Sequence, residues 1–428
     1  MAARVEGQLG CSKGFFSALK GPAFIADRIH VSGSVFLYNG FSSTGSVRFL
    51  GAKVHGQFNC NNGSFNGNGG TALSLDAAFI AGSLFLGRAF TAHGKVVLQG
   101  ALIKGDLVMR EAERLSGLSA KRVNIEGALV LRGLVNPLDN VSFVGARVGY
   151  LDDDKKSWGK NTDLDGFVYG FIHVHSAMSI SDRLKWLGVE NRVAATEGSL
   201  PEFRPQPWRH LQNVLDEMGH AEEAKQVGIE FEKRLRSAGL IGQSPESWNS
   251  VRRWFYKKLM TFLHVMYGYL TGYGYRPMLL LRSFMVVWLL CSGIYWLAAN
   301  EGAIFAPSDP LVFQNEKYAS CIPSPSSVEQ KPSNTGNWYL CADLPEAYTG
   351  FSPLAFSLDL LLPLVDLHQE KDWAPLIETP KANIFAELRG FFSAKRLVRF
   401  VMWVEILAGW GFSLLFVAVV SGLARRKE

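Results

Sequence analysis

Charged residues are scarce in this sequence: Asp, Glu, Lys and Arg make up 19% of the 428 residues, against 48% for hydrophobic residues. The net charge is only +6, and the Lys and Arg residues cluster beside apolar stretches without forming a separate basic patch. This distribution excludes nucleic acid from the partners that we expect. It indicates a chain with a membrane part, for which the lipid bilayer is the first partner.

Motifs that carry enzyme chemistry are also lacking. We find no nucleophile–base pair and no phosphate-binding loop in its proper context. The stretch GNGGTA at residues 67–72 fits the G-x-G-x-x-G/A nucleotide fingerprint, but strand-like residues follow it where that motif requires a helix. We therefore expect a loop insertion at 67–72, no cofactor and no enzyme. A membrane-associated oxidoreductase ranks third among the functional interpretations.

The spacing of Cys and His residues predicts no metal site. No Cys-x-x-Cys pair occurs, and His173 and His175 in FIHVHS have no Cys or acidic residue close by in sequence. These two histidines alternate along an expected strand. We expect them to face solvent and not to bind a metal.

Five cysteines are spread over the chain. Cys321 and Cys341 lie in the Pro-, Ser- and Asn-rich stretch 300–350, and we expect them to form a disulfide outside the cytosol. Cys11, Cys60 and Cys291 lie among apolar or cytosolic residues, and we expect them to be reduced.

Two segments, residues 278–299 and 400–424, meet the requirement of about 20 mostly apolar residues for a membrane-spanning helix. The N-terminus lacks the apolar core of a signal peptide, so we expect the chain before the first span to stay in the cytosol. Basic residues before the first span and after the second put both ends in the cytoplasm, which predicts a hairpin in a bacterial plasma (inner) membrane. These are Arg252, Arg253, Lys257, Lys258 and Arg276, and then Arg425, Arg426 and Lys427.

A further basic group lies on the predicted outer side, just before the second span. It consists of Arg389, Lys395, Arg396 and Arg399. We interpret residues 376–399 as an interfacial segment with a helix at 385–398, which keeps its charges among the lipid headgroups.

Residues 271–277, TGYGYRP, contain the four letters that line the selectivity filter of potassium channels. A filter lies between two spanning helices, because its backbone carbonyls must replace the ion's water within the bilayer. No complete span precedes residue 271. We therefore interpret the stretch as a Gly-rich hinge, with Gly272 and Gly274, at the end of an interfacial segment at 251–277, and Pro277 as the start of the next helix.

Repetition organises residues 1–175. GSVRFLGAKVHG (45–56) and GKVVLQGALIKG (94–105) match in residue type at each position, and 70–82 and 140–149 are a longer and a shorter variant. The units begin about 22 to 25 residues apart, and apolar residues alternate within them. A period of two, punctuated by Gly at a fixed repeat, predicts a right-handed parallel β-solenoid with about one coil per unit.

Residues 207–239, within a linker at 176–250, have helical periodicity. Two apolar stripes lie on either side of Gly219, which predicts an α-helical hairpin like one repeat of a tetratricopeptide array. The stripes are Leu211, Val214 and Leu215, and then Ala224, Val227 and Phe231.

Between the two spans, residues 351–375 hold an apolar stretch that is too short to cross the bilayer. Pro353, Asp359 and Pro363 interrupt it. A re-entrant segment fits this pattern, since non-helical backbone is tolerated at membrane depth only where protein covers it.

In this order of elements the chain resembles the two-transmembrane pore-loop fold. More narrowly, it resembles bacterial β-solenoid or pentapeptide-repeat proteins with an ion-channel-like C-terminal module, in which a helical hairpin also lies between the repeat and membrane modules. The resemblance implies a pore helix at 354–362, a filter position at 363–369, and Asp366, His368 and Glu405 as pore-lining candidates. Because no Gly-Tyr-Gly or Gly-Asp follows the pore helix, the resemblance does not imply potassium selectivity.

Glu405 lies about two turns into the second span. An acid there either faces a cavity or a partner, or pairs with Arg396 or Arg399 near the headgroups, and the sequence leaves both alternatives open. Gly409 and Gly411 are small enough for a close helix approach or a hinge.

Two functions fit these features. In the first, a channel-like pore module, which requires a homo-oligomer, is coupled through the helical hairpin to a cytosolic solenoid that senses or binds a ligand or protein. In the second, a non-conducting membrane anchor displays the solenoid as a scaffold for protein interaction. The expected fold class is multidomain: a β-solenoid, an α-helical hairpin and a two-span α-helical membrane module with a re-entrant segment.

Overall fold

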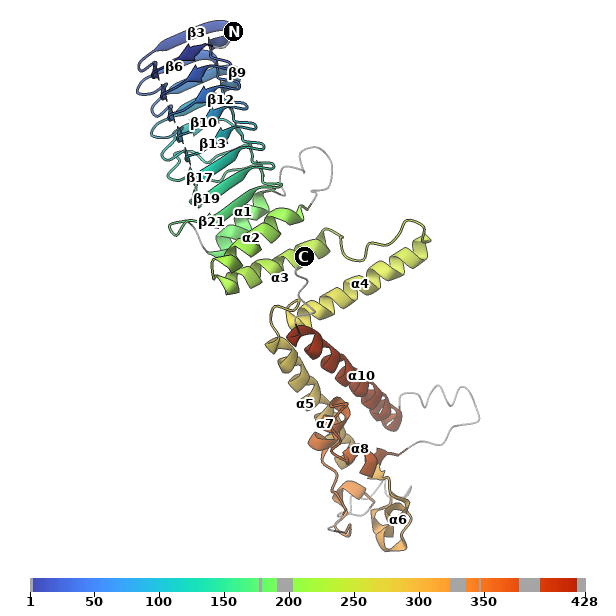
Figure 1. Ribbon diagram of the computed structural model, residues 1–428. Helices are drawn as coiled ribbons and strands as arrows, with labels where there is room; N and C mark the ends of the chain where they lie inside the picture. Colours follow the sequence, from blue (N-terminus) through green and yellow to red (C-terminus); the bar gives the residue numbers. More distant parts are fainter. Residues whose placement is uncertain are drawn as a thin grey trace. The chain divides into compact units, whose positions relative to one another are not determined.

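The structure is a computed structural model that describes residues 3–176, 179–190, 203–323, 336–345, 348–376 and 393–421 (Figure 1). The chain divides into two units, Met1–Thr261 and Phe262–Glu428, and each is described by itself. The division falls within one continuous helix, α4 (Ser250–Thr271).

The first unit begins with a parallel β-solenoid, as the repeats predict (Figure 1). The strands stack in columns along it, which form two sheets, and each coil pairs in parallel with the next. In one column, apolar residues 21 to 26 positions apart in sequence lie side by side over about seven turns. These residues are Val5, Val31, Val54, Ile80, Ile103, Ile125, Val148 and Tyr169.

Most strands of the solenoid are only two residues long, because the chain turns a corner after each of them. The first sheet contains β1 (Arg4–Val5), β2 (Leu9–Gly10), β4 (His30–Val31), β5 (Val35–Phe36), β7 (Lys53–Val54), β8 (Phe58–Asn59), β10 (Phe79–Ile80), β11 (Leu84–Phe85), β13 (Leu102–Ile103), β14 (Leu107–Val108), β17 (Asn124–Leu131), β19 (Arg147–Asp153) and β21 (Val168–Ile172). The second sheet contains β3 (Phe15–Ile25), β6 (Ser42–Arg48), β9 (Ser64–Ser74), β12 (Thr91–Val97), β15 (Arg114–Leu115), β16 (Leu118–Ser119), β18 (Val141–Ser142) and β20 (Thr162–Asp163).

Stacked apolar side chains fill the interior of the solenoid. Along β6, buried and half-buried residues alternate, which is the period-2 pattern that the sequence shows. Phe16, Phe41, Phe65 and Phe90 form a ladder with ring centroids 5.7, 5.1 and 5.3 Å apart. A coil cannot bury such a face alone, so each coil depends on its neighbours for a core.

Residues 67–72, the nucleotide-motif look-alike, lie within β9 and are followed by more strand. β6 and β9 are in register at Thr44↔Asn66 and again at Val47↔Leu73, so β9 carries extra residues between the two pairs. The predicted insertion is therefore present, but its residues belong to a strand and do not form a separate loop.

Helices α1 (Ile180–Glu190), α2 (Pro205–Glu217) and α3 (Ala221–Ser237) follow the solenoid in the part of the chain that the structure describes. The predicted hairpin of α2 and α3 is confirmed, with all six stripe residues buried and Gly219 in the turn at φ +85°. α2 packs against β21, the last strand of the solenoid. The amide of Gly166 donates to Gln206 Oε1 (3.0 Å), and the amide of Tyr169 donates to His210 Nε2 (2.9 Å). These side chains satisfy backbone groups at an edge that would otherwise pair with another strand.

We expect His210 to make the first unit sensitive to acid. Burial lowers the pKa of His210 more than the nearby carbonyl of Tyr169 raises it. The unfolded chain therefore takes up a proton more readily than the folded one, and stability falls as pH drops through the ordinary imidazole range. The melting temperature should decrease between about pH 7.5 and 5.5. The side chain of Gln does not titrate, so in His210→Gln the melting temperature should change less with pH over this range. An unchanged slope would show that His210 is not the group responsible.

Among the described residues of the second unit, two helices are long and apolar enough to cross a membrane, α5 (Met278–Asn300) and α10 (Ala394–Val420). α4 ends in a turn where Gly272, Tyr273 and Gly274 all have positive φ, and the amide of Gly274 donates to Thr271 Oγ1 (3.0 Å). The filter-like letters are thus a turn between two helices, where the sequence analysis placed them. α10 begins six residues before the expected start at residue 400, so Lys395, Arg396 and Arg399 belong to its first turns. Most of the predicted interfacial helix at 385–398 lies outside the described residues.

Short elements connect α5 and α10. Those in the described residues are β22 (Phe305–Pro307), α6 (Pro310–Phe313), the 3₁₀ helices η2 (Glu316–Cys321) and η3 (Trp338–Leu340), α7 (Pro353–Leu361), α8 (Gln369–Asp372) and β23 (Trp373–Pro375). β22 and β23 pair antiparallel, which returns the chain after α8 to the end of α5. An aromatic cluster underlies this ribbon, with Phe305 stacked on Phe351 at 4.4 Å and edge-on to Phe356 at 5.2 Å.

Candidate functional site: a short helix between two apolar helices

α7 lies where the resemblance to the pore-loop fold implies a pore helix, 354–362, with bounds shifted by one residue. Ser352 caps it by accepting a hydrogen bond from the amide of Ala355, and Pro353 opens the first turn. It packs against both α5 and α10. At 1.5 Å per residue it is about 14 Å long, less than half of α5 at about 35 Å.

Gly409 of α10 lies against the end of α7. A Cβ at this position would lie 2.4 Å from the carbonyl oxygen of Leu361, closer than side chains come to backbone. Around Gly411, on the same helix, nothing lies within 4 Å. Of the two predicted small residues, only Gly409 serves close packing in the described structure.

Glu405 is 1% exposed, and its carboxylate lies between three helices. It accepts hydrogen bonds from the Tyr295 hydroxyl of α5 and from Ser357 Oγ of α7, the latter at 2.5 Å. Of the two sequence alternatives, a cavity or a partner on one side and Arg396 or Arg399 on the other, these contacts fit a partner, although the sequence named neither hydroxyl. Glu405 therefore joins α5, α7 and α10 through side chains that are 110 and 48 residues away in sequence.

The far end of the loop after α7 is held by two side chains that the sequence analysis did not select as site residues. The buried carboxylate of Asp359 accepts hydrogen bonds from the amides of Leu367 (2.7 Å) and Glu370 (2.9 Å). Gln369, also buried, accepts one from the amide of Ser352 (3.0 Å) and donates one to the carbonyl of Gly350 (3.3 Å). An acid inside an apolar run was the available signal for Asp359, because such a group must find donors.

At the tip of this loop, Asp366 and His368 lie together. The amide of His368 donates to Asp366 Oδ1 (2.9 Å), and Lys371 forms an ion pair with the same carboxylate. Leu364 beside them is 89% exposed. The structure thus brings two of the three pore-lining candidates together at an exposed tip and places the third, Glu405, in a buried cluster elsewhere.

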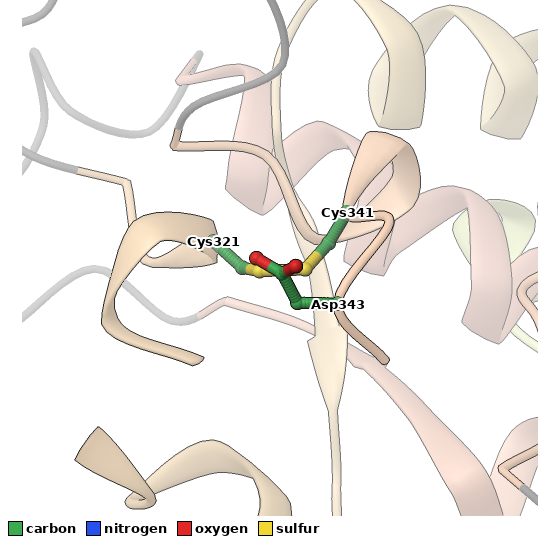
Figure 2. Close-up of side chains that lie close together, drawn as sticks. All are labelled: Cys321, Cys341 and Asp343. Carbon is green, nitrogen blue, oxygen red and sulfur yellow. A yellow bond between two sulfur atoms is a disulfide. The ribbon is translucent and has the colours of Figure 1, made fainter. Parts of the chain in front are cut away.

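Cys321 and Cys341 form a disulfide, and Figure 2 shows the carboxylate of Asp343 beside it. Ser320 Oγ donates to Asp343 Oδ2 (3.1 Å). The three side chains are close enough to share a metal ion, but disulfide sulfurs are not thiolates and make poor ligands. In this oxidised form the disulfide cross-links two parts of the segment between α5 and α7. Cys11, Cys60 and Cys291 are free thiols.

We expect the disulfide to stabilise the second unit. It closes a loop with a sequence separation of 20 residues, for which chain entropy gives about 3 kcal/mol. Replacing both cysteines with serine should lower the melting temperature of the purified protein in detergent. Cys11→Ser is the control and should change little. Reaction of Cys321 and Cys341 with maleimide in the absence of reductant would contradict the bond.

His173 and His175 follow the last solenoid strand and do not lie within it. The sequence predicts no acidic residue near these histidines, and this is wrong in space. Asp152 Oδ1, from the adjacent coil, lies 3.8 Å from His173 Nδ1. His173 is half-buried and His175 exposed. Arg132 already pairs with Asp152 at 2.8 Å, so the carboxylate has a cation partner without a metal.

Comparison with protein-family models, curated proteins and solved structures finds no match for the chain.

Proposed function

We propose that the chain is an integral membrane protein whose C-terminal unit is a channel-like module, coupled to a cytosolic β-solenoid that senses or binds a ligand. The observation that carries the proposal is α7: a half-length helix held between two full-length apolar helices. A chain that enters and leaves a bilayer on one side needs this geometry. The pairing of β23 with β22 supports it, since both then lie at the same end of α5.

Hydrogen bonding supports a re-entrant path. Backbone that leaves a helix within hydrocarbon must find partners in protein, at a cost of several kcal/mol for each group that does not. Asp359 and Gln369 supply such partners for the return of the chain from the tip. Glu405 in turn fixes α7 to α10 through Ser357.

The exposed surfaces of α5 and α10 support insertion. Few of their residues are buried, whereas a core helix of a soluble protein is mostly buried. Apolar and aromatic side chains such as Leu289, Trp403 and Leu407 are exposed. The basic residues around α4 support a cytoplasmic N-terminal unit by the positive-inside rule, and the membrane that we propose is a bacterial plasma membrane.

A pore also requires several copies of the chain. Two spans and one α7 cannot enclose a water-filled path, and the exposed tip with Leu364, Asp366 and His368 would then face a symmetry axis. Cations passing this tip would meet a ring of Asp366 carboxylates. No ring of filter carbonyls follows, so we expect cation preference with little selectivity among cations.

Conductance in a planar bilayer tests this function. Asp366→Asn should lower cation conductance or cation preference by about twofold or more, because it removes the charge at the tip. Lys371→Gln should act in the opposite direction, since Lys371 neutralises Asp366. Tyr273→Ala, in the turn before α5, should leave ion preference unchanged. Silence of the purified oligomer, or a chain that is monomeric in the membrane, would contradict the pore.

A non-conducting membrane anchor is the second candidate. The hydrogen bonds of Glu405 and Asp359 favour it, because both carboxylates are taken up by internal contacts and neither is free to meet an ion. In that case α7 is a structural plug, and the solenoid works as a scaffold for protein partners. No arrangement of described side chains leads us to propose an enzyme.

A further inference from the structure

Helix α4 carries an apolar side that is open in the described structure. Val251, Trp254, Phe255, Phe262 and Tyr269 recur at spacings of three, four and seven residues, which puts them on one side of the helix. All five are exposed, Trp254 at 62%. An apolar and aromatic side of this length is unfavourable in water and marks a surface that meets a partner or a membrane.

A surface pocket of about 420 Å³ adjoins α4. Arg253, Trp254 and Lys257 line it from the helix, and Gly239, Gly242 and Ser244 from the turn after α3. Gly242, at φ +74°, packs closely on α4: a Cβ there would lie 3.1 Å from Lys257 Cα. The glycines therefore leave space beside the two cationic side chains.

Acidic residues do not balance these cations. Residues 247–300 contain no Asp or Glu. Within the described ranges, no ion pair joins Arg253 or Lys257 to a carboxylate. Arg252, by contrast, stacks on Trp248 at 3.8 Å. One pocket is thus lined by a guanidinium, an ammonium and the Ser244 hydroxyl. These are groups that donate hydrogen bonds to a phosphate.

We propose that this pocket binds the phosphate headgroup of an anionic phospholipid, while the apolar side of α4 lies in the membrane interface. Long basic side chains reach headgroups from such a helix, and exposed Trp and Tyr favour the same depth. The inference rests on the proposed insertion of α5, which begins seven residues after α4 ends. It adds a lipid class and a site to that proposal.

Binding of a short-chain lipid tests the pocket. Calorimetry on the full chain, in nanodiscs of phosphatidylcholine, measures saturable binding of dihexanoyl phosphatidylglycerol below its micelle concentration. Arg253→Gln/Lys257→Gln should weaken binding by about tenfold or more. The matched control, Arg252→Gln/Lys258→Gln, removes the same charge from the same helix outside the pocket and should weaken it by less than about threefold. Arg253→Lys/Lys257→Arg, with unchanged melting temperature, should retain binding.

Three outcomes would overturn the proposal. An equal loss in both Gln pairs would mean diffuse attraction without a pocket, and equally tight binding of inorganic phosphate would assign the site to a soluble anion. Absence of saturable binding would remove the site. Alkaline carbonate extraction separates these results from failure of the proposed function: release of the chain from membranes contradicts insertion, whereas retention without lipid binding contradicts the pocket alone.

Discussion

Replacing Arg183 with alanine should destabilise the end of the solenoid by about 3–5 kcal/mol. The Arg183 guanidinium, on α1, donates to both carboxylate oxygens of Asp153 on β19, at 2.7 and 2.8 Å. The two side chains are 3% and 2% exposed. Without the arginine, the Asp153 carboxylate stays buried with Trp158 Nε1 as a remaining side-chain donor (2.7 Å), and a buried charge that has lost its counter-ion accounts for most of the cost.

Hydrogen exchange measures this effect where it occurs. Amides of β19 and β21 should exchange more than about a hundredfold faster in Arg183→Ala, since about 1.4 kcal/mol corresponds to a factor of ten. Arg132→Ala is the control. Its pair with Asp152 is partly exposed, and Arg110 remains 3.8 Å from that carboxylate, so we expect a loss of about 1 kcal/mol or less.

A double variant separates charge from packing. Asp153→Asn/Arg183→Met removes the unpaired charge and keeps an acceptor for Trp158, so it should recover much of the stability lost in Arg183→Ala. If the double variant is as unstable as the single one, the cost comes from lost packing of the long side chain. Equal effects of Arg183→Ala and Arg132→Ala would show that the pair is not buried in solution.

The parts of the fold that were predictable are those with a local or repeating signal. Coils of the solenoid repeat a period-2 pattern. Each buried apolar residue, such as Val54 or Ile103, pairs with an apolar residue about one repeat away in the sequence. The α2–α3 hairpin has two apolar stripes and a Gly between them. The apolar runs of α5 and α10 depend on length and composition, which the sequence states directly.

The contacts that fix the candidate site were not predictable in this way. The sequence predicts Glu405 to be an acid within a span, but nothing in the sequence distinguishes Tyr295 and Ser357 from other polar residues until the fold brings them to it. Likewise, Asp359 was noted only as an interruption of an apolar run, although its carboxylate holds the returning loop. Single hydroxyl and amide partners leave no periodic trace, because one residue on each side suffices for a hydrogen bond.

The histidines show the same limit from the other side. No acidic residue lies close to His173 along the chain, so the sequence predicts none beside it. In the structure Asp152 lies beside it, because Asp152 belongs to the preceding coil. In a solenoid, residues one coil apart are neighbours at every position. A search for sites in such folds must therefore compare residues that lie one coil apart in the sequence, as well as residues that are close along the chain.

Gly409→Ala should destabilise the packing of α7 against α10 by about 1–3 kcal/mol. The added Cβ would lie 2.4 Å from the carbonyl oxygen of Leu361 and 2.9 Å from its carbon. Both are backbone atoms, so no side chain can rotate to make room, and the end of α7 must move. Movement there pulls Ser357 from Glu405, which leaves a buried carboxylate with one hydroxyl partner fewer.

Gly411→Ala makes the same chemical change two residues later, where nothing lies within 4 Å. It should leave the packing intact and gain up to about 1 kcal/mol from the better helix propensity of alanine. The two substitutions are thus expected to change the melting temperature in detergent in opposite directions. If the pore proposal holds, Gly409→Ala should also abolish or alter conductance and Gly411→Ala should not. A Gly409→Ala protein as stable as Gly411→Ala would mean that α7 does not rest on α10, and the re-entrant interpretation would lose its main contact.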